Sequence, residues 1–83
     1  MNEMLRSLGF GQVTSTKWTN GENMMINVDS ANLDIRCYAD IYSGDLYVMS
    51  MKFYIPHSNI KDMKKGVEKF MRMVGKCIQV DEE

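Results

Sequence analysis

The sequence predicts a small α+β protein in which two helices flank a four-stranded antiparallel sheet. Three observations support this class. Apolar residues recur every three to four positions near both ends of the chain and at every second position between them. Short breaker sequences separate the alternating segments, and such short loops join antiparallel strands. The predicted order is therefore α-β-β-β-β-α, a β-meander with a short N-terminal helix and a long C-terminal helix packed on the sheet.

The N-terminal helix is predicted over residues 2 to 8, where Met4, Leu5 and Leu8 follow helical spacing before Gly9. Breaker residues then divide the alternating region into four segments. The predicted strands lie at about 12 to 19, 24 to 29, 33 to 42 and 46 to 55.

Pro56 ends the last strand because it lacks a backbone donor, and Ser58 or Asn59 can cap the long helix that follows. The apolar residues of this helix recur at steps of three and four and form its predicted buried face. They are Ile60, Met63, Val67, Phe70, Met71, Val74, Cys77 and Ile78. We expect one domain over residues 1 to 80 and an acidic tail at 81 to 83.

Alternation predicts which side chains of the last two strands face this helix. In both strands the odd-numbered positions form the apolar set, so opposed residues need position numbers with an even sum. A two-residue loop at Gly44-Asp45 gives an odd sum and would bury Lys52, which excludes it on burial cost. A three-residue loop at 42 to 44, with Gly44 in the left-handed conformation, gives the even sum.

The same rule turns the even-numbered positions of segment 24 to 29 inward, with a loop of two or four residues within 29 to 32. Asn20-Gly21 favours a two-residue type I′ loop, which points Trp18 outward. A three-residue loop is the alternative, and it would bury Trp18 and expose Val13.

With the favoured registers, the sheet face turned away from the long helix is rich in aromatic, sulfur and cationic side chains. Its candidate partner-binding residues are Trp18, Met25, Arg36, Tyr38, Lys52 and Tyr54. Tyr, Trp, Met and Arg are enriched at the centres of protein interfaces. The alternative is that the N-terminal helix covers part of this face.

The long helix carries a second candidate surface, a basic stripe. Five cations at steps of three and four lie on the side away from its apolar face: Lys61, Lys65, Lys69, Arg72 and Lys76. Such a stripe can dock on an acidic protein surface or on nucleic acid phosphates. The alternative is an ordinary solvated helix face.

Composition excludes several classes of protein. A net charge of -1 and 45% hydrophobic residues fit neither a disordered chain nor a uniformly basic one. No apolar run approaches the roughly 20 residues that cross a bilayer, and the charged first ten residues do not predict a secretory signal. Cys37 and Cys77 are far apart in the sequence and predict reduced thiols in a cytoplasmic protein, with a disulfide between them as the alternative.

No pattern for catalysis, a metal or a cofactor is present. His57 is the only histidine and lies in a predicted loop, and Gly9-Phe10-Gly11 lacks the third glycine of a dinucleotide fingerprint. We therefore expect no enzyme activity, no metal and no cofactor.

The leading hypothesis is a non-catalytic module that binds a larger protein with an acidic surface, as regulator, adaptor or inhibitor. A phage or mobile-element product that blocks a host nucleic-acid enzyme is one such setting. The alternative is direct nucleic-acid binding, with bases stacked on the sheet aromatics and phosphates held by the basic stripe. A homodimer through the exposed sheet face is a third hypothesis.

Overall fold

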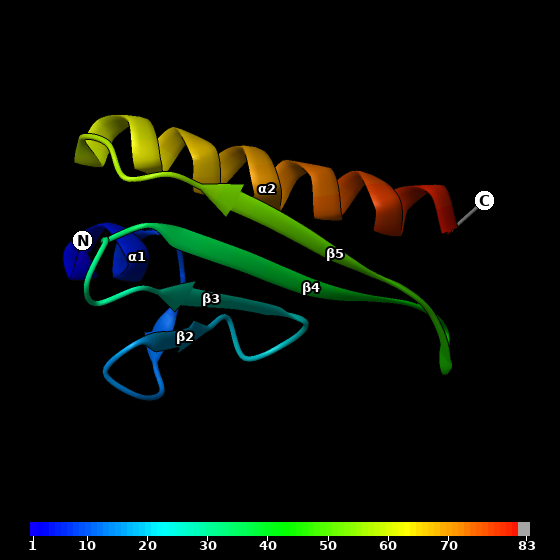
Figure 1. Ribbon diagram of the computed structural model, residues 1–83. Coiled ribbons are helices and arrows are strands. Elements are labelled where there is room, and N and C mark those ends of the chain that lie inside the picture. The colour runs from blue at the N-terminus through cyan, green and yellow to red at the C-terminus, as the bar shows by residue number, and fades with distance from the viewer. Residues whose placement is uncertain (82–83) are drawn as a thin grey trace.

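The computed structural model describes the chain from residue 1 to residue 81, with side chains up to residue 76. Its elements are α1 (Asn2–Ser7), β1 (Gly11–Gln12), β2 (Lys17–Thr19), β3 (Met24–Val28), β4 (Ile35–Ser43), β5 (Leu46–Ile55) and α2 (Ile60–Asp81). Each strand pairs antiparallel with the next, so the sheet is a five-stranded meander (Figure 1). The α+β class is confirmed, and the predicted number of strands was one too few.

The extra strand arises because the predicted strand 12 to 19 folds back on itself. Gln12 of β1 lies opposite Trp18 of β2. Between them, the Val13 N–H donates to the Lys17 carbonyl at 2.8 Å, and the Thr14 Oγ1 accepts from the Lys17 N–H at 3.1 Å. Hydroxyl side chains compete with strand pairing in this way, and here the competition produces a tight turn.

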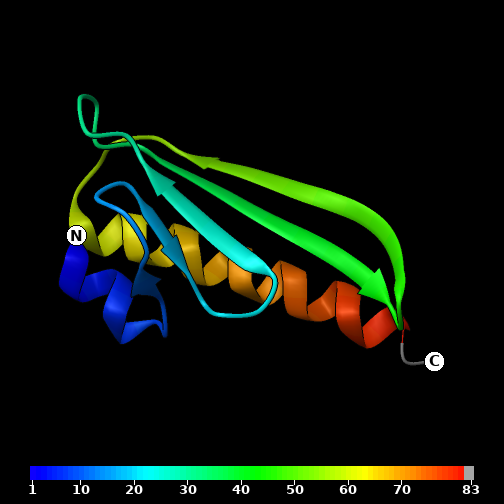
Figure 2. The ribbon, with the colours of Figure 1, turned by 90° about the horizontal axis from the view of Figure 1, so that it is seen from below.

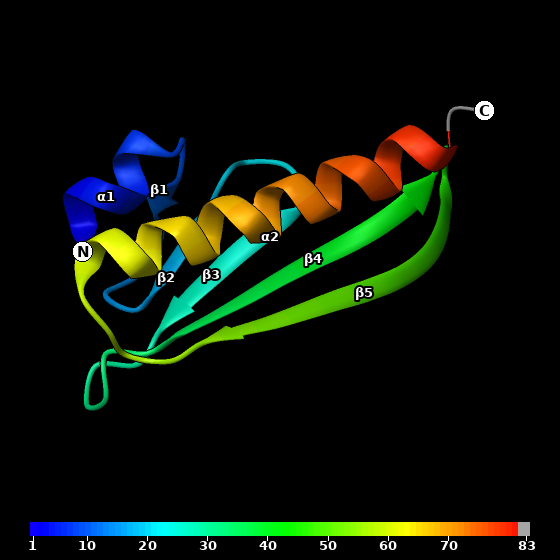
Figure 3. The same ribbon diagram turned by 90° about the horizontal axis from the view of Figure 1, so that it is seen from above.

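Both helices lie on one face of the sheet, which we call the inner face (Figure 3). Their apolar side chains join those of the strands in one core. The buried members are Met4, Leu5, Phe10, Trp18, Ile26, Val28, Ile35, Cys37, Ala39, Ile41, Ile55, Met63, Val67, Phe70 and Val74. The opposite or outer face of β3, β4 and β5 is open along its length in Figure 2. The alternative in which α1 covers the outer face is therefore wrong.

Trp18 belongs to the core, contrary to the favoured prediction. It lies opposite Ile26 and is 1% exposed. The Asn20 N–H donates to the Met24 carbonyl at 3.3 Å and encloses a three-residue loop, which was the alternative. The Asn20 side chain stabilises this loop, because its Oδ1 also accepts the backbone N–H groups of Glu22 and Met24 at 2.9 and 3.1 Å. Val13 is correspondingly exposed.

The pairing of β4 with β5 confirms that opposed residues have position numbers with an even sum, because Arg36 lies opposite Tyr54 and Tyr38 opposite Lys52. The loop is nevertheless the two-residue one that parity excluded, since Ser43 lies opposite Leu46. A bulge between the pairs Ile41–Met49 and Tyr42–Tyr47 leaves Val48 as an extra residue on β5 and restores the register. Gly44 has the expected positive φ, at 61°.

The connection between β3 and β4 is longer than predicted, because Val28 lies opposite Ile35. Asp29 Oδ1 accepts the N–H groups of Ala31 and Asn32 at 2.8 and 2.9 Å, which folds this segment into a turn. Leu33, predicted in a strand and inward, is exposed with φ 58°. Asp34, predicted outward, is buried.

Asn59 caps α2 as predicted, because its Oδ1 accepts the Asp62 N–H at 2.9 Å. Met63, Val67, Phe70 and Val74 are buried and Met71 is half-buried, as the periodicity predicts. Ile60 is 46% exposed, contrary to prediction, because it is the first residue of the helix and no preceding turn covers it.

The far end of the chain is described less fully. The side chains of Cys77 and Ile78, and residues Glu82 and Glu83 of the predicted tail, lie outside the described residues, and Asp81 is the last residue of α2. No helix within the described part of the chain combines the length and the apolar character that crossing a bilayer requires.

Candidate partner-binding surface

Five of the six sheet-face candidates lie together on the outer face, in two adjacent cross-strand rows. One row is Met25, Tyr38 and Lys52, and the other contains Arg36 and Tyr54. Side chains directly opposed on one face of a sheet are about 5 Å apart at Cβ, so each row is in contact across the strands. We call these five residues the outer-face patch.

The outer-face patch is accessible. Met25 and Tyr54 are 43% and 56% exposed, Arg36 and Lys52 are exposed, and Tyr38 is half-buried between its neighbours. Trp18, the sixth candidate, is not part of the surface. It lies in the core, where the Arg6 guanidinium is 5.6 Å from the centre of its ring. The patch is therefore smaller than predicted and centred on β4.

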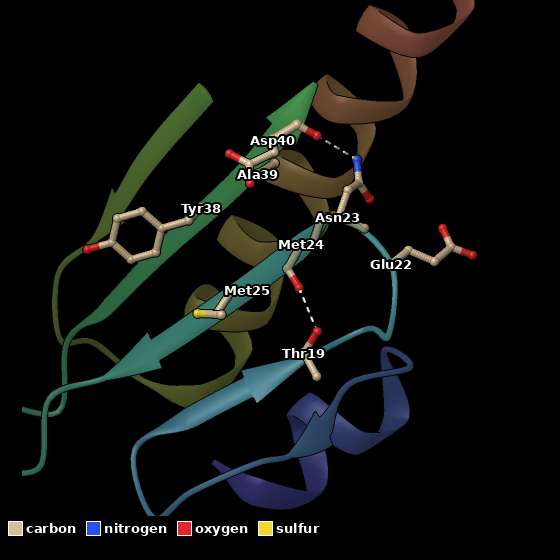
Figure 4. A pocket seen from close by; sticks show the side chains of 8 residues that line it. All are labelled: Thr19, Glu22, Asn23, Met24, Met25, Tyr38, Ala39 and Asp40. Carbon is tan, nitrogen blue, oxygen red and sulfur yellow. Dashed lines mark hydrogen bonds between the residues drawn. The ribbon is translucent and has the colours of Figure 1, made fainter. Parts of the chain in front are cut away.

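Two shallow hollows meet at Tyr38, which lines both of them. The first, of about 270 Å³, is lined by Thr19, Glu22, Asn23, Met24, Met25, Tyr38, Ala39 and Asp40 (Figure 4). The second, of about 240 Å³, is lined by Arg36, Cys37, Tyr38, Lys52, Phe53 and Tyr54. Both are smaller than the ~300 Å³ at which small-molecule pockets begin, so they suit single side chains of a partner better than a cofactor.

Asp34 holds Tyr54 in place. The Tyr54 hydroxyl donates to Asp34 Oδ2 at 2.7 Å, and this hydrogen bond to the carboxylate is the main cause that raises the pKa of Tyr54. Asp34 is 5% exposed, and its Oδ1 is buried without a partner. The bond therefore satisfies one side of a buried carboxylate and fixes the end of an exposed aromatic ring. Nothing in the sequence pattern indicated it, because alternation placed Asp34 on the exposed face.

The tip of the β4–β5 hairpin is a second exposed apolar region that the sequence pattern did not single out. Its exposed side chains are Tyr42, Leu46, Tyr47, Val48 and Met49. The rings of Tyr42 and Tyr47 pack edge to face with centres 5.8 Å apart. The Tyr47 hydroxyl and Ser50 Oγ are 2.5 Å apart, and Ser50 Oγ donates to Asp40 Oδ1 at 2.9 Å. Polar contacts thus link the tip to the border of the outer-face patch.

The basic stripe lies on the other side of the molecule. All five of its side chains are exposed, while the buried residues of α2 face the sheet. Within the region that the structure describes, no ion pair joins the stripe to a carboxylate. Because the sheet separates the stripe from the outer-face patch, one flat partner surface cannot contact both.

The thiol of Cys37 is buried and lies on neither surface. Burial raises the pKa of the free Cys37 thiol to about 12, so it stays protonated at neutral pH. Among residues 1 to 76, no three His, Cys, Asp or Glu side chains are grouped so that they could hold a metal ion.

No protein-family model, no curated protein and no solved structure matches the chain. Similarity to other proteins therefore assigns no function, and the exposed surfaces themselves are the basis for one.

Proposed function

We propose that the protein is a small non-catalytic module whose outer-face patch docks on a larger protein and thereby regulates, adapts or inhibits it. The observation that carries the proposal is the open outer face, where Met25, Tyr38 and Tyr54 stand exposed or half-exposed beside two cations. No element of the described chain covers this face (Figure 2). A cluster of large apolar groups without a cover is typical of an interaction site.

Tyr38 and Tyr54 supply the proposed anchors. Tyr38 stands between the two hollows, where a partner's side chains can close on both sides of its ring. Tyr54 is held by Asp34 before a partner arrives, so less rotamer freedom is lost on binding. Met25 beside them adapts its shape to the partner. Aromatic residues at the centre of a patch are the common hot spots of interfaces.

Charge indicates the chemistry of the partner. Arg36 and Lys52 are the cations of the patch, and Asp40 lies at its border. A partner surface with carboxylates around an apolar centre would match this arrangement, since charge-assisted hydrogen bonds fix orientation. The basic stripe would speed the encounter with such a partner through its long-range field, without contacting it.

The test is capture of a partner from the native host by the intact protein, followed by affinity measurement with the isolated partner. Tyr38→Ala is expected to weaken binding by roughly 30-fold or more, as for a hot-spot residue. The matched control is Tyr42→Ala, which removes the same side chain from the same face of β4 but at the hairpin tip. Melting curves of both variants establish that they are folded.

Two results would contradict the proposal. One is a partner that tolerates Tyr38→Ala but is lost when Lys65 and Lys69 of the basic stripe are changed to Glu. The other is nucleic-acid binding that persists at about 50 mM salt and falls steeply with added salt, which would favour the alternative function.

A further inference from the structure

The strand β5 lies at the border of the sheet and has a single neighbour, β4. It is ten residues long, and Figure 3 shows no further element beyond it. In an antiparallel sheet, alternate residues of a border strand turn their N–H and C=O groups away from the sheet. Such an edge is a template for one more strand.

The bulge of β5 protects only one end of the strand. Proteins usually guard an edge with charges, proline, bulges or short strands. The bulge at Val48 distorts the part of β5 near the hairpin tip. From Met49 to Ile55 the pairing with β4 is regular, and Lys52 is the one charged residue in this segment. The segment can therefore accept a strand.

The core is also incompletely covered along β5. On the inner face of β4, Cys37, Ala39 and Ile41 are all buried. Their opposed residues on β5 are less covered, since Phe53 is half-buried and Met49 is 45% exposed. The ring of Phe53 does contact that of Phe70 in α2, with centres 6.1 Å apart. The apolar layer thus ends in a partly open row that a further strand would close.

We propose that β5 pairs antiparallel with β5 of a second copy of the chain, about a two-fold axis normal to the sheet. This axis keeps the two inner faces on one side, so opposed positions again have an even sum. A register with Lys52 opposite itself is disfavoured by like charges. A register with Lys52 opposite the partner subunit's Tyr54 brings it toward the partner subunit's Arg36, because Arg36 and Tyr54 are opposed within one chain.

The remaining register sets Lys52 opposite the partner subunit's Ser50. Ser50 lies opposite Asp40 within one chain, so Lys52 is then in the same cross-strand row as the partner subunit's Asp40, with the partner subunit's Ser50 between them. The same register sets Met49 opposite the partner subunit's Phe53 and completes the open apolar row. Charge and apolar contact therefore favour one arrangement. The overlap is short, so we expect a weak dimer that dissociates on dilution.

The experiment measures the oligomeric state of the full chain by sedimentation over a wide concentration range. The wild type is expected to shift from monomer to dimer with concentration. Met49→Lys is expected to raise the dissociation constant by at least about tenfold, because two-fold symmetry doubles the cost of each cation. The matched control is Met25→Lys on the outer face, since the two methionines are 45% and 43% exposed. It is expected to leave the dimer unchanged.

A second pair of variants tests the register. Ser50→Lys faces Asp40 in its own sheet but the partner subunit's Lys52 across the interface, so it should weaken the dimer without weakening the fold. Ser50→Glu should do the reverse. These variants also serve if Met49→Lys fails to fold.

Three results would overturn the proposal: a monomer at every concentration, which would leave the edge to a strand of another protein; a dimer lost in Met25→Lys but kept in Met49→Lys; or a dimer strengthened by Ser50→Lys. The inference is independent of the proposed function, because Met25→Lys alters the outer-face patch and Met49→Lys alters the edge. Loss of partner binding in the first and of dimerisation in the second are separate outcomes.

Discussion

The two faces of β4 differ sharply although they alternate residue by residue along one strand. Ile35, Cys37 and Ala39 point to the inner face and are at most 2% exposed. Arg36 and Tyr38, between them in the sequence, point to the outer face and remain accessible. One strand thus contributes to the core with one set of side chains and to a docking surface with the other. Stability and binding can therefore be changed independently.

A matched pair of methionines gives the largest expected difference between the two faces. Met63 is fully buried against the inner face, and Met25 is 43% exposed on the outer face. Met63→Ala should lower the free energy of unfolding by about 2 to 5 kcal/mol, because it leaves a cavity. Met25→Ala should change it by no more than about 0.5 kcal/mol. Chemical denaturation measures both, and equal losses would contradict the difference between the faces.

The next largest expected effect is the difference in reactivity between Cys37 and a thiol introduced at position 38, on the opposite face of β4. Burial raises the pKa of Cys37 to about 12, so the native protein should react with thiol reagents at this residue only very slowly. In Tyr38→Cys the new thiol stands on the outer face, where the thiolate forms readily. It should react at least about a hundredfold faster at pH 8. Peptide mass spectrometry resolves the two sites, and similar rates would show that β4 does not separate them.

The smallest effect concerns Tyr54, whose pKa is raised above the ordinary 10.0 mainly by its hydrogen bond to Asp34. A raised pKa in the folded state means that folding favours the protonated phenol. Its contribution to stability is complete below the pKa of the unfolded chain and is lost as the pH rises through the folded value. The stability difference between wild type and Tyr54→Phe, followed by denaturation, should therefore shrink at alkaline pH. A difference that stays constant would contradict the role of the bond.

Much of the sheet and of α2 could be predicted because their patterns are long. The bounds of β5 agree with the predicted strand, and the buried face of α2 agrees at Met63, Val67, Phe70 and Val74. In an element of about ten or more residues, an incorrect helical or strand periodicity would turn many apolar side chains to solvent at once. The same reasoning predicted the outer-face position of five of the six sheet-face candidates, since they lie in or beside these long elements.

Trp18 shows where local preferences mislead. Asn20-Gly21 favours a two-residue loop that would expose the indole, but burying about 200 Å² of an aromatic ring is worth about 5 kcal/mol at most. That gain exceeds a turn preference, and the longer loop recovers its own hydrogen bonds through the Asn20 side chain. The size of the tryptophan was the signal that could have decided the register.

The bulge at Val48 and the burial of Asp34 left no signal of their own in the sequence pattern. The apolar alternation requires opposed residues of β4 and β5 to have position numbers with an even sum. A two-residue loop followed by a bulge meets this requirement as well as a three-residue loop does. Asp34 follows Leu33, which has a positive φ that an apolar residue rarely adopts. Neither feature follows from the local preferences of the residues around it.

Hydroxyl-radical footprinting of the free protein tests most directly whether the sheet has one covered and one open face. Oxidation should be fast at Met25, Tyr38 and Tyr54, and slow at Trp18, Met63 and Phe70 until the protein unfolds. Fast oxidation of Met63 together with protection of Tyr38 and Tyr54 would show that the faces are reversed, and the docking surface proposed for this protein would not exist.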